Sequence, residues 1–211
     1  LGIAGDRLER LNTFMRGFAD VVRMPQPVKR PTDVMRLLDA CVRLVRAQTD
    51  ASRIAWRWEP GGGLGIVDMD EAQMEQVLIN ILKNAVEALP ADGGSVTVRA
   101  GSSDGGGYVE VEDSGPGISD DARPHLFTPF FTTKQVGSGL GLGLSISYNI
   151  MKDFEGDLRV DNHPEVGAVF TIVLRQVMPK AASRAWFRVR WRARRKNSAS
   201  LGFEPGQPPS M

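Results

Sequence analysis

The chain has 211 residues, 42% of them hydrophobic and 24% charged, a composition that can bury a core and excludes disorder. Its single cysteine, Cys41, excludes a disulfide framework and a metal site with several cysteine ligands, and it indicates a reducing compartment. From residue 176 onward eight basic side chains stand against one acidic side chain, a net charge of +7; because the whole chain carries +1, the remainder carries −6.

The first two predicted helices are separated by prolines. Apolar residues within 1–23 recur every three or four positions, which predicts a helix that packs against other helices. Prolines then mark 24–31 as a linker. A cap at Thr32 or Asp33 begins a second helix that runs to about Gln48. Its predicted buried face consists of Leu37, Leu38, Cys41, Leu44 and Val45.

The strongest helix signal follows two short predicted strands, 54–58 and 64–67, which a glycine-rich turn separates. Asp70 begins this helix, and Gln73 completes the pattern of a capping box. The helix ends before Pro90. Its apolar stripe consists of Met74, Val77, Leu78, Ile81, Leu82, Ala85 and Leu89.

The remaining predicted elements are four strands and one helix. Strands are predicted over 95–100, 108–112, 158–161 and 169–174, and the helix spans about 140–152 after a glycine-rich region. Strands interleaved with helices predict an α+β or α/β sandwich.

The helix that begins at Asp70 carries two asparagines, Asn80 and Asn84, four residues apart and therefore on one face. Lys83 and Glu87 are also four apart, on the adjoining face. Neutral carboxamide oxygens suit a hard cation such as Mg²⁺ that shares phosphate oxygens. The alternative is a polar, solvent-facing stripe with an ion pair.

Two glycine-containing runs follow. In Asp113-Ser114-Gly115-Pro116-Gly117-Ile118, a carboxylate at a strand end can accept a hydrogen bond from an exocyclic amine, although these are also ordinary turn residues. In Gly137-Ser138-Gly139-Leu140-Gly141-Leu142-Gly143, backbone amides at a helix start could bind phosphates. Neither a dinucleotide-binding fingerprint nor a P-loop fits the second run. Between them, the aromatic and hydroxyl residues of 127–134 suit a lid over phosphates, or a core-packing loop.

These four motifs, in this order over about 31–175, resemble the four boxes of the histidine-kinase ATP-binding domain, whose wider family includes gyrase, mismatch-repair and heat-shock chaperone ATPases. The segment 147–164 is most similar to the nitrogen-regulation and dicarboxylate-transport branch of sensor kinases. The resemblance implies an α+β Bergerat-type sandwich, with a mixed sheet of about five strands packed on three helices. It divides the chain into a partial dimerisation and phosphoacceptor helix, a linker, the catalytic domain and a basic tail, at 1–23, 24–31, 32–178 and 179–211.

The resemblance also implies roles for single residues and the cofactors ATP and Mg²⁺. Asn84 would bind Mg²⁺ with Asn80 in support, and Asp113 would bind the adenine amine. Lys134 would reach the terminal phosphate and, with Asn80, act in catalysis. The other residues implied to bind nucleotide are Lys83, Glu87, Gly115, Gly117, Ile118, Thr133, Gly137, Ser138, Gly139, Leu140, Gly141 and Leu142.

The sequence departs from this family in three respects. Neither His125 nor His163 occupies the place of the phosphoacceptor histidine, so we expect no autophosphorylation by this chain alone. Glu155 stands where many relatives have glycine, which is expected to alter one turn but no nucleotide contact. The basic tail is unlike the family and is expected to be a disordered extension or a frame-shifted end.

The expected function is the ATP-binding catalytic portion of a two-component sensor histidine kinase, which transfers the γ-phosphoryl group of Mg-ATP to a histidine. ATP-hydrolysing relatives carry glutamate at the position of Asn80, and an asparagine cannot accept the proton of water. A nucleotide-binding ATPase or interaction module without kinase activity is the alternative. In the tail, three arginines alternate with apolar residues, two of them aromatic, over 187–193. This pattern could bind nucleic acid or a membrane, but a solvated extension is favoured.

The resemblance further implies a homodimer through the N-terminal hairpin of the full-length protein and a response-regulator receiver domain as partner. No stretch approaches the about 18 apolar residues of a membrane-spanning helix. Because the first residue is Leu1 rather than Met, we expect a piece of a longer protein. Its catalytic part is expected in the cytoplasm, with the parent protein free or anchored in the inner membrane.

Overall fold

The computed structural model describes residues 26–50, 52–61, 64–103, 106–134, 140–163 and 167–175. These residues all belong to the first of two compact units, Leu1–Val177. The predicted helix over 1–23, residues 137–139 of the glycine run and the tail over 179–211 lie outside the described residues.

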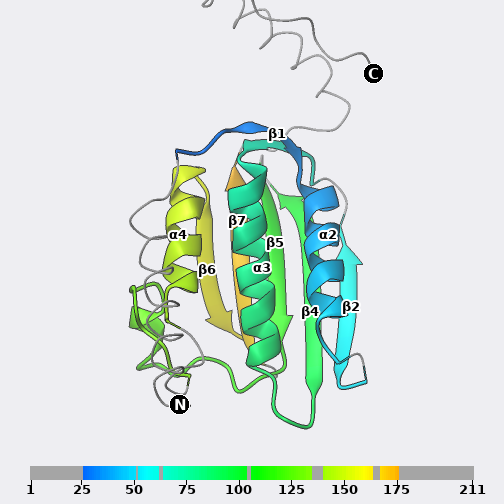
Figure 1. Ribbon diagram of the computed structural model, residues 1–211, viewed down its shortest axis with the longest axis vertical. Coiled ribbons are helices and arrows are strands. Elements are labelled where there is room, and N and C mark those ends of the chain that lie inside the picture. Colours follow the sequence, from blue (N-terminus) through cyan, green and yellow to red (C-terminus); the bar gives the residue numbers. More distant parts are fainter. Residues whose placement is uncertain are drawn as a thin grey trace, which may run out of the picture. The chain divides into compact units, whose positions relative to one another are not determined.

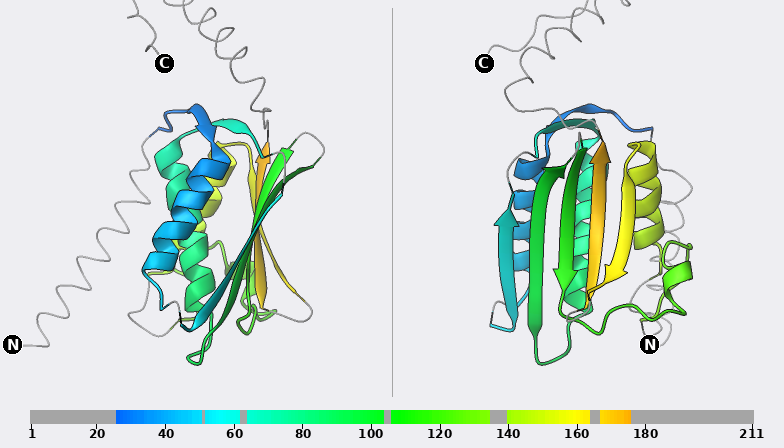
Figure 2. Two further views of the ribbon diagram at one scale, coloured as in Figure 1. Left: turned by 90° about the vertical axis from the view of Figure 1, so that its right-hand side faces the viewer. Right: turned by 180° about the vertical axis from the view of Figure 1, so that it is seen from behind.

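The described residues form two layers, a mixed five-stranded sheet and three helices (Figure 1). The strand order is β2-β4-β5-β7-β6, and only the pair β2 and β4 is parallel. The helices lie side by side on one face of the sheet, and no described helix covers the other face (Figure 2). The predicted α+β sandwich is therefore confirmed. The strands are β2 (Ile54–Pro60), β4 (Gly94–Ser103), β5 (Gly106–Asp113), β6 (Asp157–Asn162) and β7 (Ala168–Arg175), and the helices are α2 (Val34–Ala47), α3 (Glu71–Glu87) and α4 (Gly143–Asp153).

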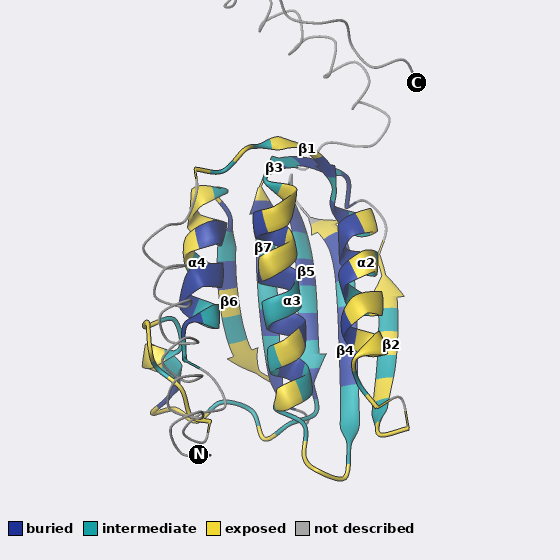
Figure 3. Ribbon diagram, viewed as in Figure 1, coloured by how far each residue is buried: buried dark blue, intermediate teal, exposed yellow. Residues whose placement is uncertain are grey.

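The hydrophobic core lies between the helices and the sheet (Figure 3). In β5 and β7 alternate residues are buried, as expected where one face of a sheet packs and the other meets solvent. One prediction is wrong: Leu44 of α2 is 44% exposed, and Val34 is buried instead. At 3.6 residues per turn, Leu44 points roughly 80° away from the middle of the buried stripe. No helix of the described part is long and apolar enough to cross a membrane.

A second, two-stranded sheet pairs β1 (Arg30–Asp33) antiparallel with β3 (Ile66–Met69). The predicted linker 24–31 thus ends in a strand, and the strand predicted at 64–67 lies two residues later. Local patterns miss β1 because its partner is about 35 residues away, and Pro31 argues against a strand unless it lies at a sheet edge.

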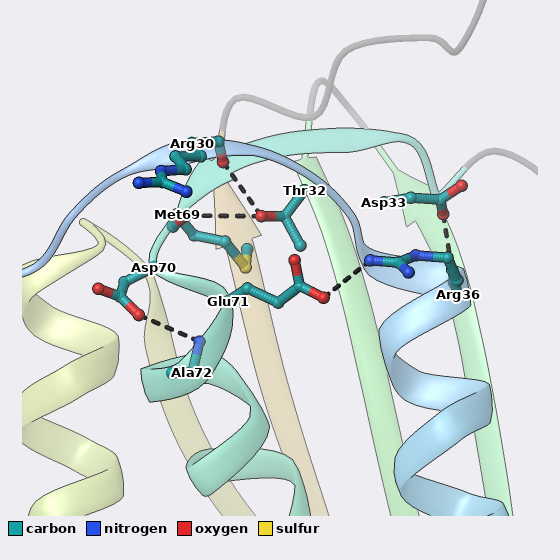
Figure 4. A network of polar contacts seen from close by, with 8 residues as sticks. All are labelled: Arg30, Thr32, Asp33, Arg36, Met69, Asp70, Glu71 and Ala72. Carbon is teal, nitrogen blue, oxygen red and sulfur yellow. Dashed lines mark hydrogen bonds and ion pairs between the residues drawn. The ribbon is translucent and has the colours of Figure 1, made fainter. Parts of the chain in front are cut away.

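This small sheet leads into the N-termini of α2 and α3 (Figure 4). Asp33, rather than Thr32, caps α2 by accepting a hydrogen bond from Arg36 N, at 3.2 Å. The Thr32 hydroxyl instead donates to Arg30 O, at 3.1 Å, within the strand pair. Asp70 caps α3 as predicted, accepting from Ala72 N at 3.0 Å and from Gln73 N at 3.1 Å. The two helix starts are therefore fixed by the side chains of the last residue of β1 and of the residue directly after β3.

The C-terminus of α4 ends in a Schellman motif that contains a glutamate. Gly156 N donates to Met151 O at 2.8 Å and Glu155 N to Lys152 O at 2.9 Å, the two bonds of that motif. Glu155 consequently has a positive φ of 58°, a conformation that glycine adopts without the cost of a Cβ.

We therefore expect Glu155→Gly to raise the free energy of unfolding by about 0.5–1 kcal/mol, because the left-handed conformation costs a residue with a Cβ about 1–2 kcal/mol and glycine loses part of that gain as chain entropy. Urea denaturation would measure it. Glu155→Ala, which keeps a Cβ and therefore the cost of the left-handed conformation, serves as the control. A Glu155→Gly variant less stable than the parent would contradict the assignment.

Candidate functional site

The candidate site lies where β5, α3 and β6 end and α4 begins, at the lower end of the domain in Figure 1. Asp113 is the last residue of β5 and is only 2% exposed. Its Oδ1 accepts hydrogen bonds from Gly115 N, at 2.8 Å, and from Ala168 N, at 3.3 Å. No hydrogen bond to its Oδ2 is found within the described part of the chain. One oxygen is thus held by backbone amides, and the other can accept a bond from a ligand.

Burial raises the pKa of the Asp113 carboxyl, and the amides of Gly115 and Ala168 oppose this shift by stabilising the charged form. A buried carboxylate with so few partners at one oxygen is costly to a fold unless it has another use. A ligand that donates a hydrogen bond to this oxygen would offset part of that cost.

Glycines pack the backbone closely around Asp113. A Cβ at Gly167 would overlap Asp113 Oδ1 and would lie 2.7 Å from Gly115 N. A Cβ at Gly115 would lie 2.6 Å from Ala88 O at the end of α3. Gly117 has a positive φ of 74°, which glycine tolerates and other residues resist. Any larger residue at Gly115 or Gly167 would displace the carboxylate or the loop.

Asn80 of α3 contacts the start of α4. Its Nδ2 donates to Ser147 Oγ at 2.9 Å, and Ser147 is 1% exposed. A Cβ at Gly143, the first residue of α4, would overlap Asn80 Oδ1. The side chain of Asn80 therefore joins two helices, and it places a carboxamide beside the backbone at the N-terminus of α4, where the helix dipole favours anions.

Asn84, Glu87 and Lys134 meet at the C-terminal end of α3. Lys134 Nζ donates to Asn84 Oδ1 at 3.1 Å and forms an ion pair with Glu87 Oε2. Lys134 comes from the loop that precedes α4, so this contact joins two segments about 50 residues apart. The ammonium group of Lys134 thus lies against the carboxamide oxygen of Asn84 and the carboxylate of Glu87. Each of these two groups can bind either a metal ion or a basic side chain.

The loop between these parts is built on unusual backbone conformations. Phe130 has a positive φ of 67° and is 48% exposed, and Gly141 has a φ of 66°. A Cβ at Gly141 would overlap Phe131 O, so the loop backbone packs directly on the chain before α4. Phe127 is stacked on Tyr148 of α4, with ring centroids 4.9 Å apart. Strain of this kind in a polar loop often marks a functional segment.

The other predicted site residues differ in how far they are buried. Lys83 and Thr133 are exposed, Leu140 and Ile118 are half-buried, and Leu142 is buried. The helix predicted from about 140 begins at Gly143 instead, because Gly141 is left-handed; Leu142 occupies the N-cap position without a capping hydrogen bond from its side chain. Gly137, Ser138 and Gly139 lie outside the described residues.

Three residues of the site are not among the predicted ones: Ser147, Asn162 and Gly167. Each contacts a site residue that is far away in sequence. The only available signal is the Asn162-His163-Pro164 run, which marks a branch of the family rather than a contact.

The side-chain oxygens of Asn84 and Glu87 fit a magnesium ion that is bound largely through phosphates. Among the described residues, no group of three or more histidine, cysteine or acidic side chains could hold a metal ion alone. Mg²⁺ usually keeps several waters and takes one or two protein oxygens together with substrate phosphates. Asn84 Oδ1 and Glu87 Oε2 already accept from one cation, Lys134, and therefore suit this role.

The sequence and the fold match known proteins. Residues 69–178 match the family described as histidine kinase-, DNA gyrase B- and HSP90-like ATPase. The C4-dicarboxylate transport sensor protein DctB of Rhizobium meliloti (strain 1021) is 38% identical over 148 residues, 69% of this chain; the chain spans 23% of that relative's length.

Two solved structures are similar. Full-length ShkA in complex with AMPPNP has a TM-score of 0.68 and 26% identity, covering 83% of this chain and 37% of that chain. The catalytic domain of the histidine kinase ThkA has a TM-score of 0.63 and 27% identity, covering 70% of this chain and 95% of that domain. The chain therefore belongs to the histidine kinase-, DNA gyrase B- and HSP90-like ATPase family, and its described part is an ATP-binding catalytic domain of the sensor histidine kinase type.

Proposed function

We propose that this domain binds Mg-ATP and donates the γ-phosphoryl group to a histidine of a two-component sensor kinase. The single observation that supports this most is the buried Asp113, whose Oδ1 is held by two backbone amides while Oδ2 can accept a bond from the exocyclic amine of adenine. The nucleotide would then lie between the end of β5 and the start of α4.

The phosphates would lie between α4 and Lys134. The dipole of α4 and the ammonium of Lys134 both stabilise negative charge, and phosphoryl transfer depends mostly on positioning and charge stabilisation. Asn84, with Asn80 in support, would hold Mg²⁺, which when bound supplies further neutralisation of phosphate charge. Lys134 would leave Glu87 and Asn84 to contact the terminal phosphate.

Asn80 favours a kinase over a hydrolase. Its amide donates to Ser147 and cannot accept a proton from water at neutral pH. The attacking histidine nitrogen uses its own lone pair, so the proton that its ring gives up must be taken by a residue other than Asn80. An ATPase or an interaction module without kinase activity is the second candidate, favoured if nucleotide binds but no phosphoryl group is transferred.

In this proposal the full-length protein is a homodimer through its N-terminal hairpin, acts in the cytoplasm, and passes the phosphoryl group to a response-regulator receiver domain. The basic tail is not part of the catalytic role, and a nucleic acid is not a partner. These elements rest on the family resemblance of the motifs described above.

Asn84→Ala should weaken Mg-ATP binding about tenfold to a hundredfold, and metal-free ATP binding less than about threefold, because only the metal loses a ligand. Calorimetry with and without Mg²⁺ would measure this difference. Asn149→Ala, an exposed asparagine of α4, is the matched control. An equal loss with and without Mg²⁺ would show that Asn84 is not a metal ligand.

The chain alone should not become phosphorylated on histidine. His125 and His163 are not placed as phosphoacceptors: the His125 ring lies against Phe131 in the loop, and His163 lies in the β6–β7 connection. Incubation with γ-labelled ATP followed by acid and base treatment tests this. An acid-labile, base-stable phosphoryl group that disappears in His125→Ala or His163→Ala would contradict the expectation.

A further inference from the structure

Asn162, the last residue of β6, binds both polar groups of another residue's backbone. Its Nδ2 donates to Ile118 O at 2.7 Å, and its Oδ1 accepts from Ile118 N at 2.8 Å. A carboxamide has a donor and an acceptor side by side, as a peptide group does, so it can pair with a backbone as a neighbouring strand would. No other hydrogen bond to the backbone of Ile118 is found among the described residues.

Ile118 ends the turn that begins at Asp113, and this turn is held at its start by the β6–β7 connection and at its end by the last residue of β6. Near its start, Gly167 N donates to Asp113 O at 2.9 Å, and His163 N donates to Gly167 O at 3.0 Å. Near its end, the side chain of Asn162 holds Ile118. A Cβ at Gly117 would lie 3.0 Å from Asn162 Oδ1, so the close approach depends on glycine there.

Arg123, which lies beyond this turn, also contacts the end of β6, but more weakly. Its Nη1 donates to Asp161 Oδ1 at 3.1 Å and to Val160 O at 3.5 Å, and the Asp161 side chain is 80% exposed. Exposed ion pairs contribute little to stability, because solvent screens them and long side chains lose entropy. The paired bonds of Asn162 are therefore the main polar attachment of the turn's end.

We infer that Asn162 is a positioning residue that fixes the adenine-binding turn 113–118 through Ile118 and so sets base selectivity; this inference rests on the proposed nucleotide site. Among the described residues, Asn162 contacts none that is assigned to the phosphates or the metal. Removing the Asn162 side chain should therefore weaken the contribution of the base to nucleotide affinity and leave the contribution of the phosphates unchanged.

The test uses the full 211-residue chain and two variants. Asn162→Ala removes both bonds, whereas Asn162→Asp keeps the size and the acceptor but turns an oxygen toward Ile118 O. We expect ATP affinity to fall about fivefold to twentyfold in Asn162→Ala and at least as much in Asn162→Asp, since unpaired or opposed polar groups cost more than absent ones. GTP affinity should change less than about twofold. Arg159→Ala, an exposed residue of the same strand, is the matched control and should change neither.

Amide hydrogen exchange gives a second measurement, independent of nucleotide. The Ile118 amide should exchange faster in Asn162→Ala than in the parent chain, and Arg159→Ala should leave it unchanged. An equal fall in ATP and GTP affinity, or an unchanged ATP affinity, would overturn the positioning role; so would unchanged exchange at Ile118. A parent chain that binds ATP no better than GTP, with no further loss in Asp113→Asn, would overturn the proposed adenine site itself. The parent chain could prefer ATP over GTP, with Asp113→Asn removing that preference and Asn162→Ala retaining it. This result would overturn only the inference about Asn162.

Discussion

Replacing Asp113 by asparagine should weaken ATP binding about a hundredfold and remove the preference for ATP over GTP, while leaving the fold intact. The amide must place its oxygen at Oδ1, because Gly115 N and Ala168 N both donate there. Its NH₂ group then takes the place of Oδ2 and points a donor at the donor of the adenine amine. Two opposed donors in a buried site are strongly unfavourable.

Calorimetric titration with ATP and GTP would measure this change. Asp92→Asn, an exposed aspartate in the turn before β4, is the matched control and should bind ATP as the parent does. If Asp113→Asn keeps the parent's discrimination between ATP and GTP, Asp113 does not bind the base.

The pH dependence of folding stability shows whether Asp113→Asn weakens ATP binding without unfolding the protein. Burial raises the folded-state pKa of Asp113 above its ordinary value of 3.8, so the folded protein binds the proton more tightly than the unfolded chain. Asp113 therefore contributes a loss of stability as pH rises from about 4 through the raised pKa. Asp113→Asn removes this contribution, and the variant without ligand should be at least as stable as the parent at pH 7. Urea denaturation between pH 4 and pH 8 would measure both.

Replacing Gly167 by alanine should reduce ATP affinity at least about thirtyfold, because the added methyl group overlaps Asp113 Oδ1 and crowds the backbone of Gly115. The backbone atoms around it cannot rotate away as a side chain can. The carboxylate must therefore shift from the position in which it meets the base.

Gly101→Ala is the comparison, since the atoms nearest its added Cβ belong to the end of the Tyr108 ring, 2.8 Å away, which can move. We expect Gly101→Ala to bind ATP like the parent. Calorimetry on both variants, with circular dichroism to confirm folding, would decide; a folded Gly167→Ala chain with parental affinity would show that Gly167 does not shape the site.

The elements that the sequence predicts well have a strong local period. The stripe from Met74 to Ala85 is fully buried in α3, and the alternation of β5 appears as a buried and a half-buried face. Asp70 can be recognised as a cap because capping is local. What the sequence misses depends on distant partners: β1 exists because β3, about 35 residues away, pairs with it.

The same division applies to the site. Asparagines four residues apart must share a helix face, so Asn80 and Asn84 stand out from α3 alone. That Asn80 binds Ser147, or that Lys134 lies against Asn84 and Glu87, depends on how two helices and a loop meet. Gly167 and Asn162 show no pattern of their own, because their importance is a matter of atoms brought within about 3 Å by the sheet order.

That sheet order also bears on how the protein folds. β4 pairs with β5 and β6 with β7 as neighbours in the chain, whereas β5 and β7 pair across the whole segment that contains the loop and α4, as in Glu112 with Val169. Local hairpins form in microseconds, but closing a long segment is slow, because chain entropy must be lost before the contacts form. Asp113 belongs to the first hairpin and Ala168 to the second, so the carboxylate, which can accept from Gly115 N locally, acquires its second amide donor only when the hairpins join. A nucleotide that binds this carboxylate would consequently stabilise the joined state over every partly folded one, and the ligand would slow unfolding of the domain more than it speeds folding.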